Sequence, residues 1–217
     1  ARARVSWPGG AFAERVFPFF LCIGGVAIPY SGDGQLARGA RRAPIVFKAF
    51  RRAVALFAIG LAMNWYAQID FANWSTALDF AHLRYFNVLQ RIGICSFLAT
   101  LVYVWWKPRT QLLFGAAILV SYFVLMTFVP VPDFGAGILD KVGNWAQYID
   151  HHVMGAHCGR SANGFYFEGK GLLTTLPALV TTLLGVAAGR CLRTSADALE
   201  KLVNLYFFGT LGLFLGA

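Results

Sequence analysis

The sequence predicts an all-α fold, a polytopic bundle of about six transmembrane helices, and three observations support this prediction. The chain has 217 residues, of which 58% are hydrophobic and only 13% charged, whereas soluble domains carry roughly 25% charged residues. Its apolar residues gather in long runs separated by polar segments. Its 20 Phe, 6 Trp and 23 Gly suit membrane helices, in which aromatic rings lie at the interfaces and glycines let helices approach. This composition excludes a disordered chain and is unlike that of a soluble enzyme.

The apolar runs give the order of the elements. A helix that crosses about 30 Å of hydrocarbon needs about 20 residues, and the runs fit this length if the second begins near Phe47. The predicted spans are 11–30, 47–69, 83–106, 111–131, 171–189 and 199–217, with a long loop at 132–170. The sequence does not begin with Met and stops inside an apolar run. We therefore expect a single transmembrane domain that is a fragment of a larger bundle.

The distribution of basic residues predicts which helix ends face the cytoplasm. Residues 31–52 hold six of the 19 Lys and Arg residues. Because cytoplasmic loops carry an excess of Lys and Arg, we expect 31–52, 107–110 and 190–198 on the inside and 132–170 on the outside. The net charge of +9 is then explained by topology, so the expected surroundings are membrane lipids and no nucleic acid partner is expected.

Several polar residues lie on the predicted outer side. Arg91 lies about eight residues into the third run, at a depth where a charge costs about 2.5–3.5 kcal/mol on insertion scales. It either faces a cavity or a partner, or it snorkels to the interface. The same topology brings a further set of polar residues to this side, namely Glu14, Asn64, Asp150, His151, His152, His157 and Glu168. Together they predict a polar pocket that opens outward.

Other patterns are explained by packing. The cysteines show no metal or redox spacing and are predicted to be packed free thiols; they are Cys22, Cys95, Cys158 and Cys191. His151 and His157 could bind zinc, but no third ligand follows at helical spacing, so we expect no metal. Gly185 and Gly189 are four residues apart and predict a close helix–helix contact.

Five blocks of the sequence together indicate a family. They are Trp7–Gly10 followed by Val16–Leu21, then Val88–Ile92, Pro130–Pro132 with Phe134 and Gly135, Tyr148–Asp150, and Gly171–Pro177. In type and order these blocks resemble the heparan-α-glucosaminide N-acetyltransferases and their bacterial homologues. The resemblance implies an integral protein of a bacterial inner membrane, without the family's first helix and several late ones. It implies transfer of an acetyl group from cytoplasmic acetyl-CoA to the amino group of a glucosamine on the far side.

The chain departs from the family pattern at positions that matter for chemistry. Arg4 stands where the family has its proposed catalytic His, and Glu14 stands where an Asp is usual. A guanidinium stays protonated, so Arg4 cannot act as a base or nucleophile. An amine that attacks a thioester must lose a proton to a carboxylate or His. The candidate catalytic residues are therefore Glu168 and Asp150 first and His157 third, and Glu14 is a further candidate.

The remaining roles follow from the chemistry of the donor. Coenzyme A carries phosphate groups, which clustered Lys and Arg residues bind. The predicted contacts for acetyl-CoA are Arg38, Arg41, Arg42 and Lys48, all in the basic segment 31–52. Either Arg91 or Gln90 could donate a hydrogen bond to an oxyanion. These two residues and Asn64 are the predicted substrate-binding residues.

Two other functions fit the same residues. A transporter or permease would line a substrate path with Arg91, Asn64 and Glu14, and Pro18 and Pro177 interrupt helices as in many transporters. A catalytically inactive relative could use the same scaffold, because the His position is occupied by Arg4. Binding of acetyl-CoA separates an acyltransferase from a permease. The sequence leaves a homo-oligomer open.

Overall fold

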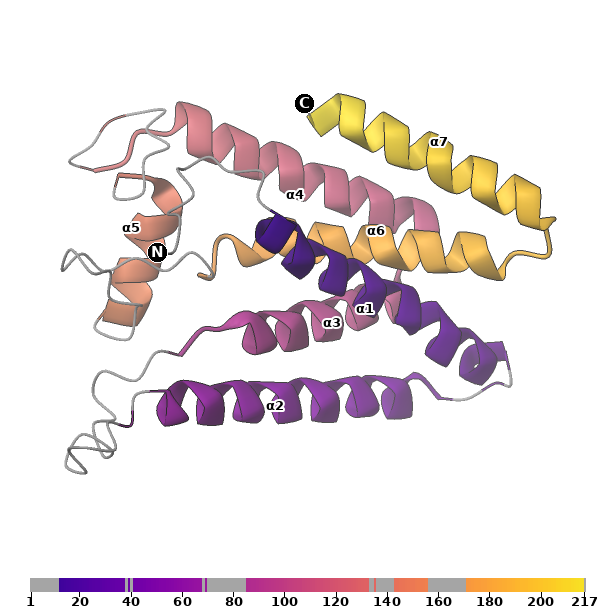
Figure 1. Ribbon diagram of the computed structural model, residues 1–217, viewed down its shortest axis with the longest axis horizontal. Coiled ribbons are helices and arrows are strands. Elements are labelled where there is room, and N and C mark those ends of the chain that lie inside the picture. The colour runs from indigo at the N-terminus through magenta and orange to yellow at the C-terminus, as the bar shows by residue number, and fades with distance from the viewer. Residues whose placement is uncertain are drawn as a thin grey trace.

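The computed structural model is an all-α bundle. It describes residues 12–37, 39, 41–67, 69, 85–132, 135, 143–155 and 171–216. The helices of this part of the chain, in order, are α1 (Phe12–Ala37), α2 (Arg42–Tyr66), α3 (Val88–Trp105), α4 (Pro108–Phe128), α5 (Trp145–Met154), α6 (Thr175–Arg193) and α7 (Ala198–Gly216), as Figure 1 shows. Outside these helices, the described residues include one isolated antiparallel bridge, between Val131 and Gly135. The predicted all-α membrane bundle is therefore confirmed.

The long helices coincide with the apolar runs. Each of the six predicted spans overlaps one of them, although the limits differ by several residues. Among the described residues, three helices are long and apolar enough to cross a membrane, namely α3, α4 and α6, and α1 contains a shorter apolar stretch over Val16–Gly32. On α4, large apolar side chains such as Leu113 and Phe123 are 71% and 61% exposed, as expected for a helix surrounded by lipid or by further helices.

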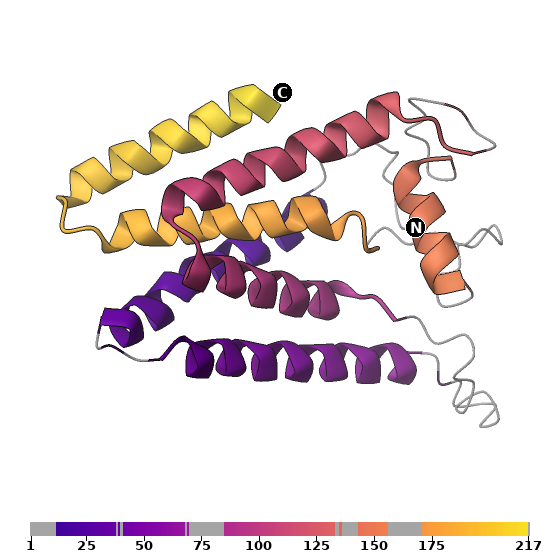
Figure 2. The same ribbon diagram turned by 180° about the vertical axis from the view of Figure 1, so that it is seen from behind.

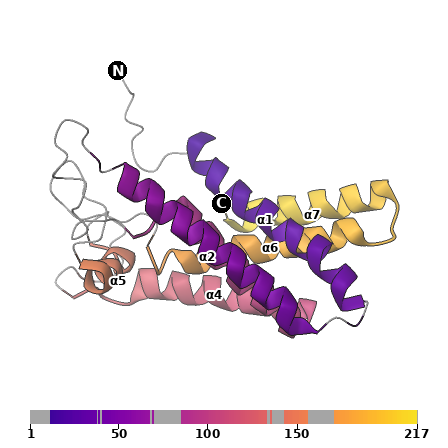
Figure 3. The same cartoon turned by 90° about the horizontal axis from the view of Figure 1, so that it is seen from below.

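The helices alternate in direction. α1, α3 and α6 end where α2, α4 and α7 begin, at the right of Figure 1, and α5 lies at the opposite end. α6 packs against α1, α3 and α4, whereas α7 packs mainly against α6 and less closely (Figure 2). α2 packs mainly against α3 and forms the near side of the bundle when it is viewed from below (Figure 3). The core therefore lies along α6, between α1, α3 and α4.

Glycines allow α1 and α6 to approach each other at backbone distance. A Cβ atom at Gly189 would lie 2.7 Å from the carbonyl oxygen of Val26 on α1. A Cβ atom at Gly185 would overlap the carbonyl oxygen of Cys22, and one at Gly25 would overlap that of Thr182. The close contact predicted for Gly185 and Gly189 is confirmed, because no larger side chain fits without separating the helices.

α2 and α3 pack as an antiparallel pair. Near the middle of the pair, a Cβ atom at Gly93 of α3 would lie 3.1 Å from the carbonyl oxygen of Ala53 on α2. One turn further on, the side chain of Gln90 lies against Gly60. At the end of the pair, Asn87 Nδ2 donates to Asn64 Oδ1 at 2.8 Å. The register between these helices is thus fixed at successive turns.

Several helix ends differ from the predicted limits for local reasons. α3 begins at Val88 rather than near 83, because the Asn87 side chain accepts a hydrogen bond from the Val88 backbone at 2.8 Å. α4 begins at Pro108 rather than 111, because proline suits the first helical position, where a backbone N–H has no partner. α5 lies within the predicted loop 132–170 and starts where Asn144 accepts from the Gln147 backbone at 2.8 Å.

Candidate functional site

Arg91 is buried in the bundle rather than directed to the interface. Its side chain is 5% exposed. Arg91 Nη2 donates to the carbonyl oxygen of Gly171 at 3.1 Å and to the hydroxyl of Thr174, both in the turn before α6. The guanidinium carbon lies 5.5 Å from the ring centroid of Phe17 on α1. Of the two alternatives that the sequence left open, the structure therefore has Arg91 facing protein partners, as intramembrane charges usually do.

The turn before α6 forms hydrogen bonds with Arg91 of α3 and with Asp150 of α5. The carbonyl oxygen of Gly171 accepts hydrogen bonds from Arg91 and also from the hydroxyls of Thr174 at 3.1 Å and Thr175 at 2.8 Å. On the other side, Asp150 Oδ1 accepts from the Leu172 backbone at 2.8 Å. We call this group, made of Arg91, Asp150, Gly171, Thr174 and Thr175, the outer polar cluster, after the outward orientation that the sequence predicts for this end of the bundle. It brings a buried cation and a buried carboxylate to one turn of backbone.

Asp150 is enclosed because of the short helix that carries it. α5 presents its buried side, which includes Ala146, Gln147 and Asp150, towards the bundle, and Asp150 is fully buried. A Cβ atom at Gly171 would overlap the Asp150 carboxylate, so only glycine lets the carboxylate approach this turn. Burial of a carboxylate is costly unless hydrogen bonds compensate it, and the Leu172 N–H supplies one.

Asn64 and Gln90 lie on the α2 side of the same helix end. Asn64 is 9% exposed and accepts from Asn87, and Gln90 is fully buried against Gly60. Four residues named from the sequence therefore lie at this end of the bundle, Asn64, Gln90, Arg91 and Asp150. Arg38, His157 and Glu168 lie outside the described residues, and for Glu14 the structure describes the backbone alone, in the first turn of α1.

The histidines of α5 stand apart from this cluster. His151 and His152 are exposed in the last turn of the helix, and the His152 ring stacks on Tyr148 with the ring centroids 5.4 Å apart. Within the described ranges, no group of three or more His, Cys, Asp or Glu side chains is arranged to hold a metal ion.

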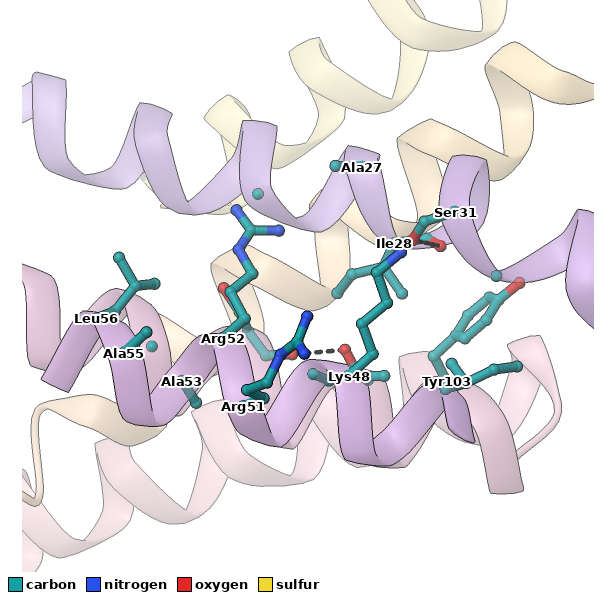
Figure 4. Close-up of a pocket in the computed structure, with 17 residues that line it drawn as sticks. Ala27, Ile28, Ser31, Lys48, Arg51, Arg52, Ala53, Ala55, Leu56 and Tyr103 are labelled. Atoms are coloured by element: carbon teal, nitrogen blue, oxygen red, sulfur yellow. Dashed lines mark hydrogen bonds between the residues drawn. The ribbon is translucent and has the colours of Figure 1, made fainter. Parts of the chain in front are cut away.

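A second polar site is a pocket of about 380 Å³ between α1, α2 and α3. Figure 4 shows Lys48, Arg51 and Arg52 extending from α2 towards Ala27, Ile28 and Ser31 on α1. Ser96, Thr100 and Tyr103 of α3 also line it. We call this the basic pocket. Three cations and several hydroxyl groups around one cavity suit a ligand with several negative charges.

The basic pocket only partly matches the residues predicted for acetyl-CoA. Lys48 lines it, whereas Arg41 and Arg42 are exposed near the start of α2 and are not among its lining residues. Arg51 and Arg52 line the pocket instead, although both were counted in the basic segment. The signal that could have selected them is their spacing, since residues three and four positions after Lys48 share its helix face.

The part of the basic pocket that Tyr103 lines is supported by residues of α6 and α4. Tyr103 lines the pocket, and the guanidinium carbon of Arg190 lies 4.7 Å from its ring centroid. Arg190 Nη1 also donates to Gln111 Oε1 at 2.9 Å. Gln111 Nε2 in turn donates to the carbonyl oxygen of Trp106 at 2.9 Å, at the end of α3. These contacts hold Tyr103 against the pocket.

The two polar sites lie in sequence along α3. The basic pocket is lined on this helix by residues from Gly93 to Tyr103, and Gln90 and Arg91 occupy the turn immediately before Gly93. A helix rises about 1.5 Å per residue, so less than one turn of α3 separates Arg91 of the outer polar cluster from Gly93, which lines the pocket. The two polar sites therefore lie close together along the same helix.

Comparison with known proteins identifies a distant relative. No family model matches the chain. The chain is 28% identical, over an alignment 243 positions long that covers 93% of this chain, to the mouse (Mus musculus) heparan-alpha-glucosaminide N-acetyltransferase. The chain spans 36% of the length of that curated relative. Together with the apolar helices, this similarity supports an integral membrane protein that is distantly related to the N-acetyltransferase.

Proposed function

We propose that this chain is part of a transmembrane acyltransferase that moves an acetyl group from cytoplasmic acetyl-CoA to an amino sugar on the outer or lumenal side. The observation that carries the proposal is the pair of polar sites on α3, a basic pocket and an outer polar cluster less than one turn apart along this helix. The similarity to a heparan-alpha-glucosaminide N-acetyltransferase supports the reaction type. An integral protein of a bacterial inner membrane is part of the same proposal.

In this proposal the basic pocket binds the donor. Lys48, Arg51 and Arg52 pair with phosphate groups of coenzyme A, and their side chains extend into the pocket from α2 (Figure 4). The volume of about 380 Å³ lies within the usual range for small-molecule sites, roughly 300–1,000 Å³, and would hold the reactive arm rather than the whole coenzyme. The arm would point along α3 towards Gly93 and the outer polar cluster.

The outer polar cluster supplies the acceptor side. Among the described residues, Asp150 is the candidate base that lies in the cluster, and Glu168 remains a second candidate from the sequence. A deprotonated carboxylate can take the proton that the attacking amine loses. Arg91 positions the turn before α6, because it donates hydrogen bonds to Gly171 and Thr174 in this turn. Asp150 contacts the same turn through the Leu172 backbone, so Arg91 acts on the candidate base through the turn.

Binding of acetyl-CoA to the purified full-length protein in lipid nanodiscs tests this assignment. The double variant Arg51→Gln/Arg52→Gln removes two charges from the pocket, and Arg41→Gln/Arg42→Gln removes two from the same helix outside it. We expect the pocket variant to weaken binding by about tenfold or more, since hydrogen bonds to charged groups contribute roughly 1.5–3 kcal/mol. The effect should be larger at low salt.

The matched control decides the location of the donor site. Equal weakening by both double variants would mean that acetyl-CoA responds to net charge alone and would remove the basic pocket from the proposal. A wild-type protein that binds no acetyl-CoA and acetylates no glucosamine would contradict the function as a whole and favour a transporter or an inactive relative.

A further inference from the structure

Gln90 is a buried amide without a hydrogen-bond partner in the part of the chain that the structure describes. Its side chain is fully buried, and neither Nε2 nor Oε1 has a hydrogen bond. Buried polar side chains in native proteins are nearly always hydrogen-bonded, and the exceptions often have a functional cause. By comparison, the buried amide of Gln111 donates to Trp106 and accepts from Arg190. We therefore expect a group of a bound ligand to form a hydrogen bond with the Gln90 amide.

The position of Gln90 indicates which ligand group that is. The amide lies against Gly60 of α2, where a Cβ atom would be 2.7 Å from Cδ and 3.0 Å from Nε2. Gly93, one turn along α3, and Leu56, one turn along α2, both line the basic pocket. The amide thus lies between the same two helices as the pocket, about one turn beyond the lining residues Gly93 and Leu56 and on the side of the outer polar cluster.

Arg91 is less suited to the same role. Its Nη2 is engaged by Gly171 and Thr174 on the α6 side, and a donor that already holds a turn in place would have to leave it to reach a substrate. An oxyanion site needs donors that are in place before the charge develops and need no rearrangement. The Gln90 amide meets this requirement, because it is already packed against Gly60 and no hydrogen bond from the described residues competes for it.

We propose that Gln90 Nε2 donates the hydrogen bond to the carbonyl oxygen of the acetyl thioester and stabilises the oxyanion during transfer; this rests on the acyltransferase function proposed above. The amine nitrogen attacks the carbonyl carbon, a C–N bond forms, and the carbonyl oxygen takes the π electron pair. When the carbonyl re-forms, the C–S bond breaks and coenzyme A leaves as a thiolate. The amine proton passes to the Asp150 carboxylate and from there to solvent, and the thiolate takes a proton from water.

Gln90→Met tests the inference, with Gln111→Met as the matched control in the full-length protein. Gln90→Met removes an unpaired amide and keeps a similar shape, so the melting temperature should stay the same or rise. Acetyl transfer to glucosamine should fall by about 10²–10³-fold, the usual loss for one oxyanion donor. The loss should lie in kcat while acetyl-CoA affinity stays close to wild type. Gln111→Met should lower the melting temperature, because it removes the hydrogen bonds that the Gln111 amide makes with Arg190 and with the Trp106 carbonyl.

Gly60→Ala is an independent variant that displaces the amide without removing it. The added Cβ would collide with the end of the Gln90 side chain, which is flexible and can turn away. We expect a fall in kcat of the same kind, and no further fall when Gly60→Ala is added to Gln90→Met, because both changes act through one amide. Fully additive losses in the double variant would overturn the inference.

The remaining outcomes are also decisive. Near wild-type turnover in Gln90→Met would eliminate Gln90 as the donor. A melting temperature as low as that of Gln111→Met, with turnover unaffected by Gly60→Ala, would give Gln90 a structural role instead and overturn the inference. A wild-type protein that binds no acetyl-CoA would refute the proposed function, whereas an active wild type with an unaffected Gln90→Met variant would refute this inference alone.

Discussion

At the scale of single residues, Asp150 combines a structural contact with a proposed chemical role, and two substitutions separate them. Asp150→Asn keeps an oxygen that can accept from the Leu172 backbone but removes the basic carboxylate. We expect acetyl transfer to fall by about 10²–10⁴-fold, the usual contribution of a general base, with little change in the melting temperature. Asp150→Ala should lower both, because the buried Leu172 N–H then loses its acceptor, at a cost of about 1–3 kcal/mol.

Turnover assays and thermal unfolding of both variants check this expectation. If Asp150→Asn retains near-full turnover, Asp150 is a structural residue and Glu168→Gln becomes the next test. If neither change alters turnover, the base is not a carboxylate of the outer site, and the acyltransferase proposal loses its acceptor chemistry.

Two residues of the outer polar cluster could be found from the sequence, for different reasons. Arg91 stood out because a charge inside an apolar run is costly, whereas Asp150 was selected because the predicted topology put its loop on the same outer side. The contacts themselves could not be predicted, since they depend on the conformation of the turn at Gly171 and on the position of α5 beside this turn. The same holds for Arg51 and Arg52, which line a pocket only because α1 faces them across it.

At the scale of helices, the contact between α1 and α6 depends on the absence of side chains. Gly185→Ala should destabilise the protein by about 1–3 kcal/mol, the usual cost of overpacking, because its Cβ would overlap the Cys22 backbone and cannot be avoided by a side-chain rotation. Gly212→Ala on α7 is the matched control, since nothing lies within 4 Å of its Cβ position. There the higher helix propensity of Ala should leave stability unchanged or raise it slightly.

Denaturant or thermal unfolding in one detergent compares the two variants directly. Similar shifts for Gly185→Ala and Gly212→Ala would mean that the close approach of α1 and α6 contributes little to stability. The contact would then set the position of α1 relative to α6 without contributing much to the free energy of unfolding.

The existence of the long helices was predictable, whereas the short one was not. Apolar runs of membrane length identify α1, α2, α3, α4, α6 and α7. α5 has 10 residues, is too short to span a membrane and mixes Tyr and Ile with Asp and His, so it resembles a loop in sequence. Its signal was local, an Asn144 side chain that caps the Gln147 backbone. The site depends on this helix, because α5 carries Asp150.

At the scale of the whole molecule, the alternating helices make the topology testable from two exposed positions at opposite ends. Val153 on α5 is 63% exposed, and Arg109 is exposed in the first turn of α4. In a variant whose native cysteines are replaced by alanine, an impermeant thiol reagent added to spheroplasts should modify Val153→Cys and not Arg109→Cys. Both should react after the membrane is broken.

The reverse labelling pattern would invert the bundle. The basic pocket would then open away from the cytoplasm, and acetyl-CoA made inside the cell could not be its donor. Labelling of both positions before lysis would indicate that at least one of the helices between them does not cross the membrane.

The uneven packing of the bundle has a mechanical consequence. α1 and α6 are joined at backbone distance through Gly25, Gly185 and Gly189, whereas α1 and α2, which face each other across the basic pocket, touch very little. α2 packs mainly against α3, so we expect the tilt of α2 to change more easily than the spacing between α1 and α6. A small rocking of α2 would widen or narrow the pocket and carry Lys48, Arg51 and Arg52 with it, while α1 and α6 keep their contact unchanged.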